Sequence, residues 1–196
     1  MAKVVRKDHS RDATYAGVSP QLKGEAKMLN ERIENILNEQ INKEFYSAYL
    51  YLAMSAYFNE NAYFGLANWT RVQAREEVDH AMILFDHILS RNGSVRLKQI
   101  DTPEYKAGEP IEIFQQAYDH EVSVSRAIDE IAKMAQEEND YTTRNFINWF
   151  LKEQIEEEEQ TLDIVNELKI YGNDRGALYH IDENLGRRVY EPPAGV

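Results

Sequence analysis

Four stretches of this sequence each place an acidic side chain in the middle of an otherwise apolar stripe. The acidic residues are Glu44, Glu77, Glu121 and Glu157. Apolar residues in these stretches recur at steps of three and four, which puts them on one face of an α-helix. His80 follows Glu77 by three positions, so both side chains share one helix face. Gln154 precedes Glu157 by three positions in the same way. The pattern therefore predicts a helical core that contains carboxylates, an imidazole and an amide.

Carboxylates in such a core need compensating positive charge. Acidic residues are almost never fully buried unless paired, and each buried charge costs several kcal/mol to desolvate. No Lys or Arg occupies these stripes beside the acids. Two divalent cations would neutralise four carboxylates, which makes a metal-free structural bundle the weaker alternative. Because the sequence has no cysteine, oxygen ligands with one imidazole favour iron or manganese over structural zinc.

The elements that position these residues are expected to be long helices. Four are predicted, at 28–59, 62–91, 110–138 and 141–171. Short polar turns join the first helix to the second and the third to the fourth as antiparallel neighbours. The link at 92–109 is long enough to cross the whole bundle. With a fifth short helix at 174–186, the fold class is all-α: a four-helix bundle with one long crossover between the second and third helices.

Length and composition set the outer limits of this interpretation. The 196 residues suit one domain, placed at 28–188 between a flexible N-terminal tail, 1–27, and a loose C-terminal tail, 189–196. The net charge of −12 argues against nucleic acid and anionic membranes as partners. No apolar run reaches the roughly 20 residues that a membrane helix needs. The N-terminus also lacks the apolar region of a signal peptide, so a cytoplasmic location is expected.

Five segments give the sequence a resemblance to the bacterial and archaeal non-haem ferritins. They are NKEFYSAYLYLAMSAYF, QAREEVDHAMILFDHI, HEVSVSRAIDEIAKMA, NFINWFLKEQIEEEE and GALYHIDENL. The resemblance covers about residues 28–185 and implies iron storage. It implies that Fe(II) is oxidised by O2 or H2O2 at a di-iron ferroxidase site within each subunit. It further implies that ferric mineral is kept inside a hollow cage of twenty-four identical subunits.

The resemblance also implies roles for individual residues. The implied ligands of the first iron are Glu44, Glu77 and His80. The implied ligands of the second iron are Glu121, Glu157 and the bridging Glu77. Gln154 and Tyr51 match residues that lie beside the irons and act on the bound oxygen species or in electron transfer. The implied third iron site consists of Glu76, Glu153, Glu156 and the shared Glu157.

Several alternatives remain open within and outside this family. A bacterioferritin places a second Glu-x-x-His on the fourth helix and a haem-binding methionine on the second. This chain has Gln154-x-x-Glu157 and Val78 there, so no haem is expected. A rubrerythrin-like peroxidase needs cysteines that the sequence lacks, and a di-iron oxygenase needs a substrate channel that sequence alone does not show.

Other notable residues are interpreted structurally. His87 and His120 are not assigned to metal, Trp149 is taken as core, and Glu158 and Glu159 are taken as a solvated face. The segment 45–58 is apolar or aromatic almost all round. One bundle buries only one stripe of a helix, so this segment is expected to contact another subunit.

Overall fold

The computed structural model describes residues 29–194 and shows an all-helical chain over that range. The helices are α1 (Glu31–Glu60), α2 (Phe64–Ser90), α3 (Pro110–Glu137), α4 (Tyr141–Tyr171) and α5 (Arg175–Leu185). The predicted fold class is confirmed. The N-terminal tail expected at 1–27 and the last two residues of the C-terminal tail lie outside the described residues.

Local sequence accounts for where two of these helices begin. Glu109 and Glu112 form a reciprocal capping box at the start of α3, with Pro110 as the first helical residue. At the start of α4, the Asp140 side chain accepts a hydrogen bond from the backbone N–H of Thr143 at 3.1 Å. These caps satisfy N–H groups that the first helical turn leaves free.

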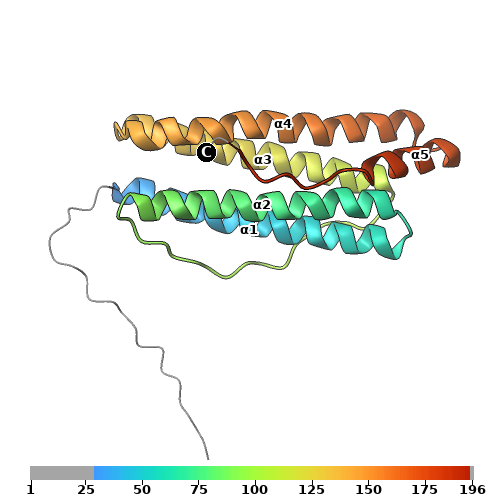
Figure 1. The fold of residues 1–196 in the computed structure, drawn as a ribbon, viewed down its shortest axis with the longest axis horizontal. Helices are drawn as coiled ribbons and strands as arrows, with labels where there is room; N and C mark the ends of the chain where they lie inside the picture. The colour runs from blue at the N-terminus through green and yellow to red at the C-terminus, as the bar shows by residue number, and fades with distance from the viewer. Residues whose placement is uncertain (1–28, 195–196) are drawn as a thin grey trace, which may run out of the picture.

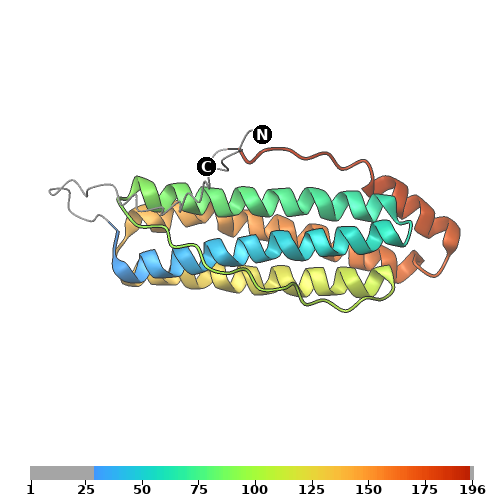
Figure 2. The same cartoon turned by 90° about the horizontal axis from the view of Figure 1, so that it is seen from below.

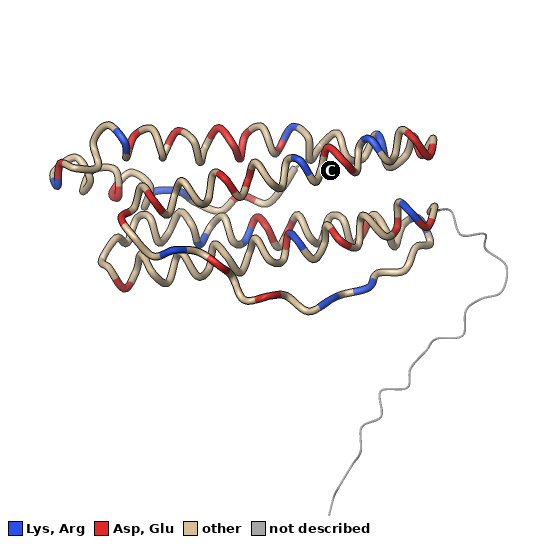
Figure 3. The backbone as a smooth tube through the Cα atoms, turned by 180° about the vertical axis from the view of Figure 1, so that it is seen from behind, with Lys and Arg blue, Asp and Glu red and all other residues tan. Residues whose placement is uncertain are grey.

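The crossover between α2 and α3 sets the direction of the second helix pair. It runs along the outside of the bundle, so α3 begins at the end of the molecule opposite to the end of α2 (Figure 1). Arg96 binds the Glu34 carboxylate at 2.7 Å, and Lys98 pairs with Glu39, both acids belonging to α1. In Figure 3, basic positions lie along the crossover and acidic positions lie on all the helices. The crossover is therefore fastened to α1 by charge.

The core is divided into two apolar clusters that lie on either side of the acidic stripe positions. One cluster contains Phe58, Trp69 and Phe114, and the other contains Leu37, Leu84 and Phe150, among others. Each of the four long helices contributes one of its halves to the first cluster and the other half to the second, and its acidic residue lies between these halves. The carboxylates thus occupy a polar layer across the middle of the bundle.

No helix within residues 29–194 is long and apolar enough to cross a membrane.

Candidate metal centre

The four stripe carboxylates meet in the interior, as the sequence predicts. Glu44 and Glu77 are 1% exposed, Glu121 is 0% and Glu157 is 3% exposed. His80 lies with them at 2% exposure. These burial values are unusual for acidic side chains, and they show that four different helices contribute to one enclosed polar layer.

Glu44, Glu77 and His80 form a group that fits a metal ion. One possible ligand atom from each lies within 4.8 Å of the others. His80 Nδ1 lies 3.6 Å from Glu77 Oε2. Among the described residues, Glu44 Oε2 and His80 Nε2 are buried without any hydrogen-bond partner. Buried polar atoms are almost always paired, so these two atoms are available to a cation.

A second group adjoins the first through the same imidazole. His80, Glu153 and Glu157 also offer ligand atoms within 4.8 Å of one another. Glu121 belongs to neither group at this distance, although it is fully buried beside them. Glu156 is exposed and also belongs to neither group. The structure therefore brings Glu153 toward the buried layer and leaves Glu156 at its solvent side.

Burial strongly favours the protonated form of these carboxyl groups. Loss of hydration, followed by repulsion from Glu77, raises the pKa of Glu44 to about 8. Burial likewise raises the pKa of Glu121 and of Glu157 to about 8, with neighbouring carboxylates contributing next. Burial and Glu157 raise the pKa of Glu77 well above its usual range. Burial therefore favours the neutral carboxyl groups, and a bound cation would favour their charged form.

Hydrogen bonds hold the second half of the cluster in place. The Tyr51 hydroxyl donates to Glu121 Oε1, which places this fully buried tyrosine directly against a candidate ligand. Gln154 Nε2 lies 3.3 Å from the other oxygen of Glu121. Both residues therefore lie where the sequence predicts, and both orient Glu121 rather than Glu157.

Two glutamines that sequence reasoning did not assign also contact the candidate ligands. Gln40 Nε2 donates to Glu44 Oε1 at 2.8 Å, and Gln73 Nε2 donates to Glu157 Oε2 at 2.6 Å. Gln40 precedes Glu44 by four residues on one helix face, a spacing that could have identified it. The contact between Gln73 and Glu157 joins two different helices, so no spacing within one helix predicts it.

His87 and His120 lie outside the cluster. His120 Nε2 lies 2.7 Å from the Ser47 hydroxyl, between α3 and α1. His87 Nε2 lies 3.1 Å from the Thr143 hydroxyl, and its ring stacks on Phe146. Neither residue belongs to a group of possible metal ligands among the described residues. Trp149 packs its ring against His80, with centroids 5.6 Å apart, so it supports a candidate ligand from the core.

The chain beyond α5 differs from the loose tail that was expected from residue 189. It turns back and runs along α2 (Figures 1 and 2). Arg188 binds Glu76 Oε2 at 2.6 Å. The Tyr190 hydroxyl donates to Asp79 Oδ2 at 2.5 Å, and Arg75 lies over the Tyr190 ring. Tyr190 is held because it offers both a ring and a hydroxyl to this face of α2.

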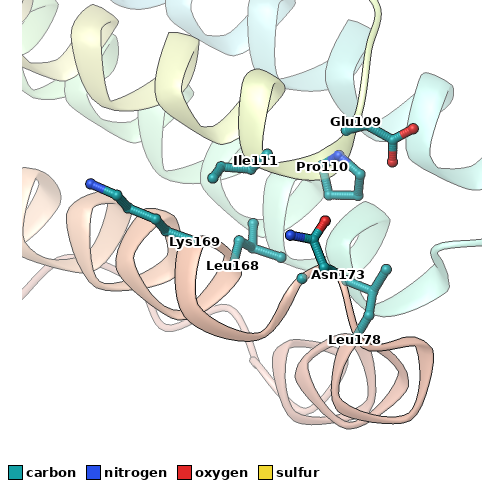
Figure 4. A pocket seen from close by; sticks show the side chains of 8 residues that line it. Glu109, Pro110, Ile111, Leu168, Lys169, Asn173 and Leu178 are labelled. Atoms are coloured by element: carbon teal, nitrogen blue, oxygen red, sulfur yellow. The ribbon is translucent and has the colours of Figure 1, made fainter.

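A pocket of about 140 Å³ lies at the end of the bundle, between the start of α3 and the turn from α4 to α5 (Figure 4). Its lining includes Pro110, Ile111, Leu168 and Leu178. Pro110 stands 11 residues before Glu121 on the same helix, which separates them by roughly 16 Å at 1.5 Å per residue. The pocket is therefore remote from the carboxylate layer and is formed by the packing of α5.

Comparisons with known proteins agree with this geometry. The family described as the ferritin-like domain matches residues 34–170. The chain is 37% identical to a bacterial non-haem ferritin of Bacteroides fragilis over 82% of its length and 100% of the relative. A non-haem ferritin of Staphylococcus aureus is 33% identical over 84% of this chain and 99% of the relative. Among solved structures, an open-pore ferritin of Archaeoglobus fulgidus has a TM-score of 0.82 and 42% identity, covering 84% of this chain and 100% of its own.

Proposed function

Because the chain belongs to the ferritin family, we propose that it stores iron and that each subunit oxidises Fe(II) at a pair of sites bridged by Glu77. The observation that carries this proposal is a buried layer of four carboxylates and the His80 imidazole. In this layer Glu44 Oε2 and His80 Nε2 have no hydrogen-bond partner among the described residues. In this proposal Fe(II) is the substrate, and O2 or H2O2 is the oxidant.

The proposed ligands divide between two iron positions. Glu44, Glu77 and His80 bind one Fe(II), in keeping with their mutual distances. Glu157 and Glu121 bind the other. Glu77 is the proposed bridge because its carboxyl group interacts with both Glu44 and Glu157. Tyr51 and Gln154 hold Glu121 in position through their hydrogen bonds. Metal binding then requires that the bound carboxylic acids release their protons.

Charge balance explains both oxidation and release. Four carboxylates neutralise two Fe(II) ions, and anionic oxygen ligands stabilise Fe(III) relative to Fe(II). Two Fe(II) ions supply the two electrons that reduce O2, with two protons, to hydrogen peroxide. The two Fe(III) ions then carry more positive charge than the four carboxylates can balance. This excess favours addition of hydroxide or oxide and movement of the ferric product out of the site.

A third iron position is proposed on the side of the cluster that faces Glu76 and Glu153. Glu153 already offers an oxygen within 4.8 Å of ligand atoms of His80 and Glu157. Glu156 is the more exposed member of the proposed set. We propose that this position receives iron on its way between the paired site and the stored mineral.

Exposed apolar side chains support an oligomer. Tyr49 and Leu52 on α1 are 52% and 49% exposed, and Val78 and Met82 on α2 are both 41% exposed. Such a patch needs cover from another molecule, which we take to be a second copy of this chain. The proposed assembly is a hollow twenty-four-subunit cage, without haem and located in the cytoplasm.

Stopped-flow oxidation tests the proposed chemistry. Two Fe(II) per subunit are mixed with oxygenated buffer, using the wild type, Glu77→Ala, Glu153→Ala and the control Glu159→Ala, whose side chain is exposed on α4. We expect Glu77→Ala to abolish the fast phase because it removes the only carboxylate that touches both irons. Glu153→Ala should keep that phase and change only later turnover. A wild-type fast phase in Glu77→Ala refutes the paired site.

A further inference from the structure

The segment that follows α5 brings a guanidinium group to the edge of the carboxylate layer. Arg188 donates to Gln73 Oε1 at 2.7 Å and to Glu76 Oε2 at 2.6 Å. Its guanidinium lies 4.3 Å from the centroid of the Trp69 ring. The side chains of Arg188 and Glu76 are each only 17% exposed. One arginine is thus held on three sides by one face of α2.

The backbone around Arg188 is fixed as well. Asn68 Nδ2 donates to the Arg188 carbonyl at 2.9 Å. Two residues further on, Tyr190 binds Asp79 through its hydroxyl. These contacts lie on successive turns of α2, so the segment Gly186–Tyr190 is fastened along that helix. The position of Arg188 therefore does not depend on its own side chain alone.

Arg188 brings positive charge close to Glu76 and Glu157. Burial raises the pKa of Glu76, and the guanidinium opposes that rise. The same guanidinium also acts on Glu157, whose partner Gln73 accepts from Arg188 and donates to Glu157. Arg188 consequently fixes which end of the Gln73 amide faces the candidate iron ligand.

A divalent cation at Glu76 would meet this arginine directly. Like charges a few ångströms apart repel strongly in a partly buried site. Arg188 lies in the segment that follows α5, so its contact with Glu76 can be broken without separating two packed helices.

We propose that Arg188 is a positioning residue that competes with the third iron ion for Glu76, and that binding of this ion breaks the Arg188–Glu76 contact and so loosens the segment Gly186–Tyr190 on α2. The inference rests on the proposed function, because it concerns the third position of the same site. It assigns to the C-terminal segment control over whether that position is filled.

Zinc titration tests the competition without any redox step. Calorimetry with Zn²⁺ is done on the full-length wild type, Arg188→Ala, Arg188→Lys and Arg187→Ala. Arg187 is the matched control because its side chain pairs with Glu183 of α5 and is 70% exposed. We expect Arg188→Ala to tighten the third Zn²⁺ by about tenfold, the effect of removing one nearby like charge. Arg188→Lys keeps the charge and should remain within about threefold of the wild type.

Amide hydrogen exchange tests this loosening in the wild-type chain and so does not depend on how a variant folds. The amides of Gly186, Arg187 and Arg188 donate to carbonyls at the end of α5. We expect peptides covering 186–194 to exchange faster only when the third Zn²⁺ per subunit binds. Glu153→Gln, which removes a proposed third-site ligand without touching Arg188, should abolish this increase.

Three outcomes overturn the inference. One is an unchanged third Zn²⁺ affinity in Arg188→Ala, and another is equal tightening in Arg187→Ala. The third is exchange at 186–194 that does not respond to the third Zn²⁺. Absence of two tight Zn²⁺ sites in the wild type has a different meaning, because it refutes the paired site and, with it, this inference.

Discussion

Glu44 is expected to destabilise the protein when no metal is bound. Its side chain is 1% exposed, and burial raises its pKa from 4.5 to about 8. Below pH 4.5 the group is protonated in both the folded and the unfolded chain. Between pH 4.5 and 8 only the unfolded chain loses the proton, so the free energy of unfolding falls as pH rises. This loss is about 1.4 kcal/mol per pH unit, or roughly 3 kcal/mol at pH 7.

Glu44→Gln removes this titration while keeping the shape of the side chain. The metal-free variant is therefore expected to unfold at a higher temperature than the metal-free wild type at pH 7. A gain of 2 to 3 kcal/mol corresponds to about 5–10 °C for a chain of this size. The difference should become small near pH 4.5, where Glu44 is protonated in the folded chain and about half protonated in the unfolded chain. Addition of Zn²⁺ should reverse the order, because the variant has lost a ligand.

Differential scanning calorimetry of chelator-treated protein at pH 4.5, 6 and 7 makes the measurement. Glu159→Gln is the matched control, since it changes an exposed carboxylate on α4 and should not alter the melting temperature by more than about 2 °C. The reasoning is refuted if metal-free Glu44→Gln is less stable than the wild type at pH 7. The reasoning is also refuted if the stability difference between metal-free Glu44→Gln and the wild type does not change with pH.

Three further outcomes are expected. Tyr51→Phe should leave Zn²⁺ affinity within about threefold of the wild type, because no ligand charge is lost. It should nevertheless alter the kinetics of repeated Fe(II) oxidation, and unchanged multi-turnover kinetics would make Tyr51 purely structural. His80→Ala should weaken one of two tight Zn²⁺ sites by about tenfold or more, whereas two unaltered sites would exclude His80 as a ligand. Zn²⁺ binding at pH 7 should release more protons than at pH 9, because burial raises the pKa of Glu44, Glu121 and Glu157 to about 8. Calorimetry in buffers of different ionisation enthalpy measures the proton release. Equal release at both pH values contradicts the assignment of these carboxylates as ligands.

Much of the fold and of the buried layer could be predicted from sequence because both depend on local helical periodicity. The spacing that placed Glu77 and His80 on one face of α2 is a property of that helix alone. Four such stripes are compatible with only a few bundle arrangements. The buried positions of Glu121, Glu157 and Gln154 followed from the same pattern.

Other contacts depend on how the chain returns after α5, which no periodic pattern encodes. Arg188 lies more than 110 residues from Glu76 in sequence, and the segment that carries it has no helical repeat. The hydrogen bond from Gln73 to Glu157 depends on how α2 and α4 face each other.

The central claim is that Glu77 bridges two iron ions inside each subunit. The most direct test is anomalous diffraction at the iron edge from crystals soaked anaerobically with Fe(II). The account predicts two peaks per subunit within the carboxylate layer. One should lie beside Glu44 and His80, the other beside Glu121 and Glu157, with Glu77 in contact with both. A single peak in this layer, or iron bound only at the exposed acidic surface of α4, would contradict the account.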